Sequence, residues 1–134
     1  MRFLLDTDTC IYWLRGRESV HKCVVTVGLS DIAVSVITLA ELRYGAACSQ
    51  QPEANQHAID ALANGIVVLG VDPSVVRVFA DVKAALRKQG MLIEDFDLLI
   101  AATARTFGLT LVTNNTGHFS RITGLRLENW VSDP

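Results

Sequence analysis

Three acidic side chains stand out in this sequence because of the segments around them. Asp6 directly follows a short apolar segment, Glu41 lies in a helix predicted over 37–48, and Asp97 lies near the start of a largely apolar helix predicted over about 95–107. A carboxylate at the edge of a core has a high desolvation cost unless something binds it. Three such groups from separate elements would repel one another, so a bound cation is their natural counter-charge.

Helical spacing indicates that two of these acids point toward the core edge. Glu41 shares one helix face with residues at i−4, i+3 and i+7, namely Ile37, Tyr44 and Cys48. Asp97 lines up in the same way with Ile100, Ala101 and Ala104. Each acid also has a purely structural interpretation. Glu41 could be the buried partner of an arginine such as Arg43. Asp97 could stabilise the helix dipole, and Asp6 could cap the next helix. Asp95 is the residue predicted to cap the helix of Asp97.

A cluster of oxygen ligands favours Mg²⁺ or Mn²⁺ over zinc. Such an ion can activate water and stabilise the charge that develops when a phosphodiester is hydrolysed, so this chemistry follows naturally from the cluster. No Ser-His-Asp or Cys-His arrangement competes, because His21 and His57 lie in predicted helices and are interpreted as surface or packing residues.

Short apolar segments alternate with longer helical patterns, which is typical of an α/β fold with a parallel sheet. Strands are predicted at about 2–5, 32–35, 66–69 and 110–113, with a weak last strand near 126–128. Helices are predicted at about 9–14, 18–29, 37–48, 52–64, 72–89 and 95–107. Asp8 is expected to cap the first helix, and Asp72 or Ser74 the fifth.

Ligands of open parallel sheets bind outside the carboxyl ends of the strands. Asp6-Thr7-Asp8 follows the first strand, Glu41 follows the second on its helix, and Thr113-Asn114-Asn115 ends the fourth. These segments are therefore expected to meet at one edge of the sheet.

Composition sets the remaining limits. The 134 residues, 50% of them hydrophobic, fit a single domain over 1–134. The 19% charged fraction is low, which suggests apolar surface covered by a partner. No apolar run approaches the length of a membrane span, and Asp6 comes too early for a secretory signal, so a cytoplasmic location is expected. Three scattered cysteines, Cys10, Cys23 and Cys48, are interpreted as free and mostly buried thiols.

A net charge of −2 does not indicate nucleic-acid binding, so any contact with RNA must be local. The candidate contacts are basic residues that could equally form solvated helix faces: Arg15 with Arg17, Arg43, and Lys83 with Arg87 and Lys88.

Several strings of this sequence, taken in order, resemble the PIN-domain toxins of the VapC type. They are FLLDTDTCI at 3–11, TLAELRYG at 38–45, DLLIAA at 97–102, LVTNN at 111–115 with Phe119, and GLRLENW at 124–130. The resemblance covers essentially the whole chain. It implies a PIN-like α/β/α sandwich with a central parallel sheet, RNA cleavage that depends on Mg²⁺ or Mn²⁺, a homodimer, and neutralisation by a cognate VapB-type antitoxin.

The resemblance also implies roles for individual residues. Asp6, Glu41 and Asp97 match the three principal metal-site acids of the family, while Thr113 and Asn115 match positions that often complete the site. Many PIN domains carry Asp in place of Asn115, some close relatives carry Glu in the segment where this chain has His118, and Asp8 replaces a common Asn. Toxins with a similar Thr-Asn-Asn segment include endonucleases that cleave initiator tRNA in the anticodon stem-loop.

Two alternatives come from other functional classes. An apolar strand followed by Asp6-x-Asp8 resembles the nucleophile motif of haloacid-dehalogenase phosphatases, in which Asp6 would attack phosphorus and Asp8 would act as acid or base. That reading leaves Glu41 unexplained. A catalytically degenerate PIN domain that only binds RNA is the other alternative, motivated by the missing acid at Asn115.

Overall fold

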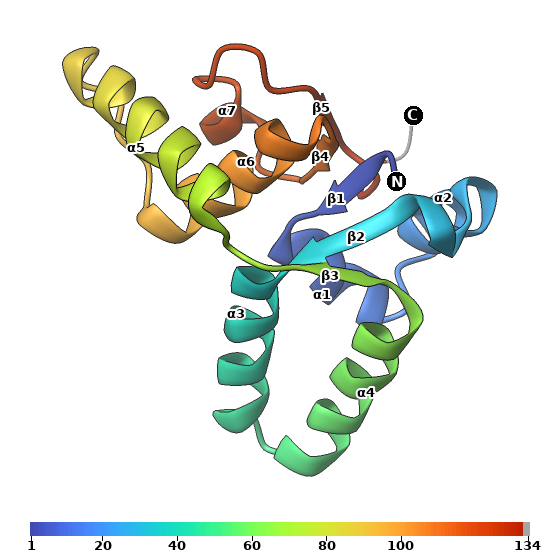
Figure 1. The fold of residues 1–134 in the computed structure, drawn as a ribbon. Coiled ribbons are helices and arrows are strands. Elements are labelled where there is room, and N and C mark those ends of the chain that lie inside the picture. The colour runs from blue at the N-terminus through green and yellow to red at the C-terminus, as the bar shows by residue number, and fades with distance from the viewer. Residues whose placement is uncertain (133–134) are drawn as a thin grey trace.

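Residues 1–132 of the chain are described by the computed structural model, in which a five-stranded sheet lies between two layers of helices (Figure 1). The strands are β1 (Phe3–Leu5), β2 (Ile32–Ser35), β3 (Val67–Leu69), β4 (Thr110–Val112) and β5 (Leu127–Glu128). All neighbours pair in parallel, in the order β3-β2-β1-β4-β5. This arrangement puts β1 at the centre, where Leu4 pairs with Ala33 on one side and with Leu111 on the other.

Seven α-helices connect these strands over the described residues. They are α1 (Thr7–Leu14), α2 (Glu18–Val27), α3 (Val36–Ala47), α4 (Pro52–Gly65), α5 (Pro73–Lys88), α6 (Asp95–Phe107) and α7 (Thr116–Phe119), with a short 3₁₀ turn at Leu29–Asp31. Helices α3 and α4 form an antiparallel pair on one side of the sheet, and α5, α6 and α7 gather on the other (Figure 1).

The strands divide their side chains between two separate cores, as the alternation of a buried strand requires. Phe3, Leu5 and Val34 pack on the face that is covered by α1 to α4. Leu4, Ala33 and Leu111 pack on the opposite face, against α5, α6 and α7. The predicted α/β/α sandwich with a parallel sheet is therefore confirmed.

The helix ends correct three predictions. Asp6, not Asp8, is the N-cap of α1, because the Asp6 side chain accepts from the backbone N–H of Thr7 and the helix begins earlier than predicted. Helix α2 ends at Val27 instead of Leu29, since Gly28 has a φ of 90° that leaves the helical region. Asp95, the predicted cap of α6, is instead the first residue of that helix. Glu94 occupies the N-cap position, and its side chain makes no capping hydrogen bond.

Other local predictions are confirmed or revised in part. Asp72 caps α5 by accepting from the N–H of Val75. All three cysteines are free, but only Cys10 is buried: Cys23 is half-buried and Cys48 is exposed. Within residues 1–132, no helix has both the length and the apolar character that crossing a membrane requires.

Candidate active site

The chain leaves β1 at Asp6, and both oxygens of this carboxylate are held by the protein. Its Oδ1 accepts from the backbone N–H of Thr7 at 2.8 Å, and its Oδ2 accepts from the hydroxyl of Thr113 at 2.8 Å. The Asp6 backbone N–H donates to the carbonyl of Val112, so the ends of β1 and β4 are joined next to the side chain. Only 5% of Asp6 is exposed. The carboxylate is thus fixed at the carboxyl edge of the sheet, as predicted.

Burial raises the pKa of Asp6 from its ordinary value of 3.8 to about 7. The negative charge of Asp8 adds to this increase, and that of Asp97 makes a smaller contribution. Hydrogen bonds from Thr113 and Thr7 favour the ionised form and partly oppose the rise. A group with such a pKa is a candidate functional residue, since nearby positive charge would be needed to keep it ionised.

Glu41 lies on the first turns of α3 and is half-buried. Its Oε1 accepts from the hydroxyl of Thr7 at 2.7 Å, so α3 is connected directly to the start of α1. The prediction that Glu41 shares a core-facing side of this helix with Tyr44 and Cys48 is wrong, because Tyr44 is 74% exposed and Cys48 is also exposed. The buried stripe of α3 consists of Thr38, Leu42 and Ala46, and Glu41 lies beside it.

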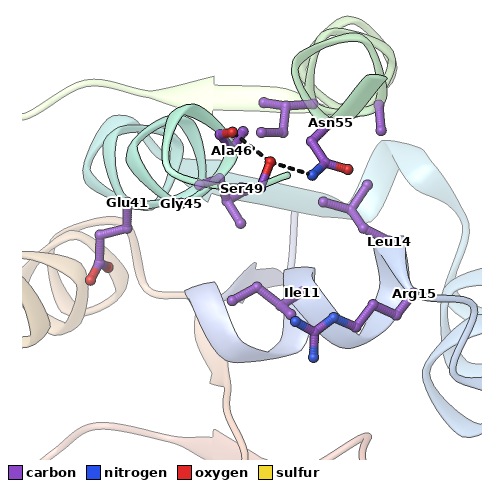
Figure 2. Close-up of a pocket in the computed structure, with 11 residues that line it drawn as sticks. Ile11, Leu14, Arg15, Glu41, Gly45, Ala46, Ser49 and Asn55 are labelled. Carbon is purple, nitrogen blue, oxygen red and sulfur yellow. Dashed lines mark hydrogen bonds between the residues drawn. The ribbon is translucent and has the colours of Figure 1, made fainter. Parts of the chain in front are cut away.

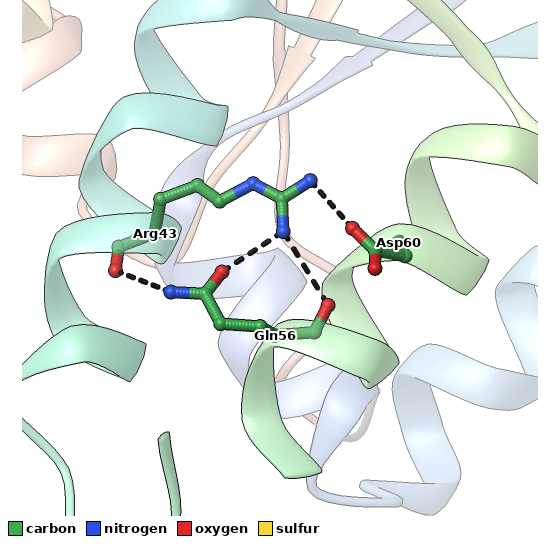
Figure 3. A network of polar contacts seen from close by, with 3 residues as sticks. All are labelled: Arg43, Gln56 and Asp60. Carbon is green, nitrogen blue, oxygen red and sulfur yellow. Dashed lines mark hydrogen bonds and ion pairs between the residues drawn. The ribbon is translucent and has the colours of Figure 1, made fainter. Parts of the chain in front are cut away.

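The alternative that Glu41 is the ion-pair partner of Arg43 is also wrong. Arg43 points toward α4, where it contacts Asp60 at 2.7 Å and donates to Gln56 Oε1 at 2.8 Å (Figure 3). Gln56 returns a hydrogen bond to the backbone carbonyl of Arg43 at 3.1 Å. Arg43 therefore joins two helices and does not pair with the carboxylate of Glu41.

Asp97 is half-buried in the first turn of α6. Burial is the main cause of its raised pKa, followed by the charges of Glu41 and Glu94, while His118 opposes the increase. Three residues on its helix face are buried as predicted: Ile100, Ala101 and Ala104. Helices α3 and α6 contact each other, which explains why the charge of Glu41 raises the pKa of Asp97.

Asp8 uses its carboxylate to hold the protein itself. One oxygen accepts from the N–H of Thr9 at 2.6 Å, and the other accepts from the N–H of Asn114 at 3.1 Å. Thr113 Oγ1 lies 3.4 Å from the same oxygen, a longer contact than its bond to Asp6. Asp8 therefore ties the start of α1 to the loop after β4.

The remaining sequence candidates lie in that loop. Buried Thr113 accepts from the N–H of Asn115 at 3.0 Å, so it is bonded both to its own loop and to Asp6. The exposed Asn115 side chain contacts Nδ1 of His118 at 2.9 Å. His118 is also near enough to Asp97 to affect its pKa. All seven predicted site residues thus lie at this edge, and within residues 1–132 every one except Asp97 has a side-chain hydrogen bond to the protein.

The acid cluster has no lysine or arginine partner within the described part of the chain. None of Asp6, Asp8, Glu41 or Asp97 is in an ion pair there, although five ion pairs are found elsewhere. Among residues 1–132, no three His, Cys, Asp or Glu side chains converge closely enough to enclose a metal ion. Partly exposed carboxylates such as those of Glu41 and Asp97 suit an ion such as Mg²⁺, which retains water and takes only one or two protein carboxylates. The donor set therefore fits a hard divalent cation.

Two residues of this site were missed by the sequence predictions. Thr7 bonds to Asp6 through its backbone N–H and to Glu41 through its hydroxyl, and the hydroxyl of Thr38 lies 3.1 Å from that of Thr7. Their positions in the sequence could have predicted them, because Thr7 directly follows Asp6 and Thr38 lies one helical turn before Glu41.

A groove of about 280 Å³ lies beside the acid cluster, between α1, α3 and α4. Glu41 lies at one end of this groove, and Leu14 and Arg15 lie at the other (Figure 2). Its walls are mainly apolar or small side chains, including Ile11, Gly45 and Ala46. The site therefore continues into a surface that could receive a partner.

Comparison with known proteins places this geometry in a family. The PIN domain pattern matches residues 3–125, so the chain belongs to the PIN domain family. PIN-domain nucleases generally use divalent metal ions. The family assignment gives no support to the dehalogenase-type alternative.

Within the family, the similarity is to VapC proteins. The chain is 40% identical to the ribonuclease VapC2 of Haemophilus influenzae over 131 residues, which cover 98% of this chain and 99% of that protein. It is 37% identical to the tRNA(fMet)-specific endonuclease VapC of Shigella flexneri, with coverage of 97% and 98%. A structure of DNA-bound VapBC from Salmonella typhimurium superposes with a TM-score of 0.92 at 34% identity, over 97% of this chain and 98% of that one.

Proposed function

We propose that this protein is a Mg²⁺-dependent endoribonuclease that acts in the cytoplasm as the toxin of a type II toxin–antitoxin system. The observation that carries the proposal is the cluster of Asp6, Glu41 and Asp97 at the carboxyl edge of the sheet, none of which is in an ion pair within residues 1–132. Two relatives that match over nearly their whole lengths are named as a ribonuclease and a tRNA endonuclease.

Each acid has a proposed role that follows from its surroundings. Asp6, Glu41 and Asp97 would hold the ion at their edge of the sheet, one or two of them directly and the rest through its bound water. When bound, the ion supplies charge stabilisation for the scissile phosphate and activation of the attacking water. Thr113 would keep Asp6 oriented, and Asp8 would hold the loop of Asn114 in place through the backbone.

The proposed substrate is initiator tRNA, cleaved in the anticodon stem-loop so that translation stops. The name of the Shigella flexneri relative supports this choice. Unpaired bases of such a loop are accessible to proteins, as in most sequence-specific RNA recognition. Asn115 and His118, both exposed at the site, are the candidates for direct contact with the RNA.

We further propose a VapB-type antitoxin as the protein partner, and a homodimer as the state of the toxin. The similar solved structures of VapBC support the first assignment. The groove beside Glu41 offers the antitoxin an apolar surface that adjoins the acid cluster, so one bound segment could cover both (Figure 2). Exposed apolar side chains such as Val36 and Phe96 are consistent with a further protein interface.

The test is to express the protein without its antitoxin and to sequence RNA ends after induction. We expect growth arrest with new ends at discrete sites in one RNA class, and recovery when the antitoxin is coexpressed. Purified protein should cleave the same RNA with Mg²⁺ and lose at least ~100-fold in rate with EDTA, the scale at which electrostatic groups act in catalysis.

The matched controls are Asp97→Asn and Asp95→Asn. Asp97→Asn removes a proposed ligand and should abolish arrest, whereas Asp95 lies on the same helix, pairs with Lys83 and should be dispensable. Equal toxicity of folded Asp97→Asn would contradict the nuclease mechanism. RNA binding without cleavage would instead favour the degenerate binding module, which the absence of an acid at Asn115 motivates.

A further inference from the structure

Two threonine hydroxyls connect α1 and α3 next to Glu41. The Thr7 hydroxyl lies 2.7 Å from Glu41 Oε1 and 3.1 Å from the hydroxyl of Thr38. We infer that Thr7, supported by Thr38, is a positioning residue that holds Glu41 in the acid cluster. This inference rests on the proposed ribonuclease function and assigns part of its machinery to two uncharged side chains.

The direction of the hydrogen bonds follows from the number of protons. A hydroxyl has one proton to donate, so Thr7 cannot donate to both Glu41 and Thr38. The carboxylate is the stronger acceptor and lies at the shorter distance, so Thr7 donates to Glu41. Thr38 then donates to the oxygen of Thr7, which gives the chain Thr38 to Thr7 to Glu41.

The hydrogen bonds from Thr38 to Thr7 to Glu41 are held in place by buried and restricted groups. Thr38 is completely buried on α3, one turn before Glu41, and its χ1 angle is restricted because it is β-branched. Thr7 is fixed from the other side, since its backbone N–H donates to Asp6. Thr7 is thus bonded to two of the three acids, which lie 35 residues apart in sequence (41 − 6) on different elements.

Glu41 needs such support for two physical reasons. Its side chain has several rotatable bonds, and ordering it has an entropic cost that one strong hydrogen bond helps to offset. Its charge and that of Asp97 repel each other, as the raised pKa of Asp97 indicates. Without the hydroxyl, Glu41 would be free to rotate toward solvent, because the groove at its side is open.

The test uses paired substitutions at Thr7. Thr7→Val keeps the shape of the side chain and removes the hydroxyl, and it should lower kcat/KM for RNA by ~10-fold, the value of one charge-assisted hydrogen bond. Thr7→Ser keeps the hydroxyl and should stay within ~3-fold of the unsubstituted protein. Thr38→Val should show a smaller loss than Thr7→Val, because it acts on Glu41 only through Thr7.

A double-mutant cycle with Glu41→Ala distinguishes positioning from a general loss of structure. If Thr7 acts through Glu41, Thr7→Val should cause no further loss of activity in the Glu41→Ala background. The same cycle is then measured by urea unfolding in metal-free buffer. The unfolding equilibrium constant of the double mutant should differ by about 5-fold or more from the value expected if the two single substitutions acted independently.

The unfolding cycle separates this inference from the proposed function. A protein that cleaves no RNA but shows the coupling would contradict the ribonuclease proposal and retain the connection between Thr7 and Glu41. Additive effects in the unfolding cycle, or an equal loss of activity in Thr7→Ser and Thr7→Val, would overturn the inference. Thr26→Val is the control, because Thr26 is an exposed residue of α2 whose hydroxyl donates to the Lys22 carbonyl, so this substitution should leave both measurements unchanged.

Discussion

Asp6 makes the stability of the metal-free protein depend on pH. Its pKa is about 7 in the folded protein and is expected near 3.8 in the unfolded chain. Between these values the folded state binds the proton more tightly, so the free energy of unfolding falls as pH rises from about 4 to about 7. Asp97 contributes in the same direction, because its pKa is raised as well.

We therefore predict that Asp6→Asn stabilises the metal-free protein at pH above 7. Removal of the buried charge should raise the free energy of unfolding at about pH 8 by ~2–4 kcal/mol, and the gain should vanish near pH 4, where Asp6 is already protonated. Urea denaturation with EDTA at both pH values checks this. An equal effect of the substitution at the two pH values would contradict the assigned burial cost.

Helices α3 and α4 provide a contrast between structural and site residues. Arg43, Gln56 and Asp60 connect them through the contacts of Figure 3, and Arg43 and Asp60 remain substantially exposed, at 41% and 52%. An ion pair in this setting contributes little and is screened by salt. Its position suggests that Arg43 serves the helix pair and not RNA, although the sequence had made it a candidate contact.

We predict that Asp60→Asn lowers the free energy of unfolding by at most ~1 kcal/mol, an effect that high salt should reduce. Cleavage of RNA should remain within about twofold of the unsubstituted protein, because no group of the acid cluster contacts this ion pair. Parallel measurements of unfolding and of initial cleavage rates are needed. A large rise in KM for RNA would instead mean that this face contacts the substrate.

At the scale of the whole molecule, a divalent ion should act as a stabilising ligand. Burial of Asp6 and Asp97 and the repulsion among the clustered carboxylates weaken the folded state, and a bound cation relieves both effects. An ion at ~100 times its Kd adds about 2.7 kcal/mol of stability. Because the acids must ionise to bind it, this gain should increase as pH rises through about 7.

We predict that Mg²⁺ raises the Tm by several degrees at about pH 8 and by less at about pH 5. Asp97→Asn should remove most of the increase, whereas Glu53→Gln, a change to an exposed acid on α4, should retain it. Differential scanning calorimetry with a monovalent salt at matched ionic strength separates specific binding from screening. An equal Tm increase in both variants would show that the ion binds elsewhere.

Local patterns were sufficient for the elements and for part of the site. The range of α6 was predicted correctly because Gly108 and a long apolar pattern mark it, and all five strands were expected. The cap of α1 was assigned to the wrong residue, since Asp6 and Asp8 are both good caps and only the hydrogen bonds distinguish them.

By itself, the sequence determined the class of fold and the three acids at one edge of the sheet. Both depend on short-range information: the periods of strands and helices, and the position of a polar residue just after a strand. The tertiary structure alone decided which groups surround those acids. Thr7 bonds to Glu41 and Asp8 bonds to Asn114 across long stretches of chain, and such pairings depend on how the elements pack together.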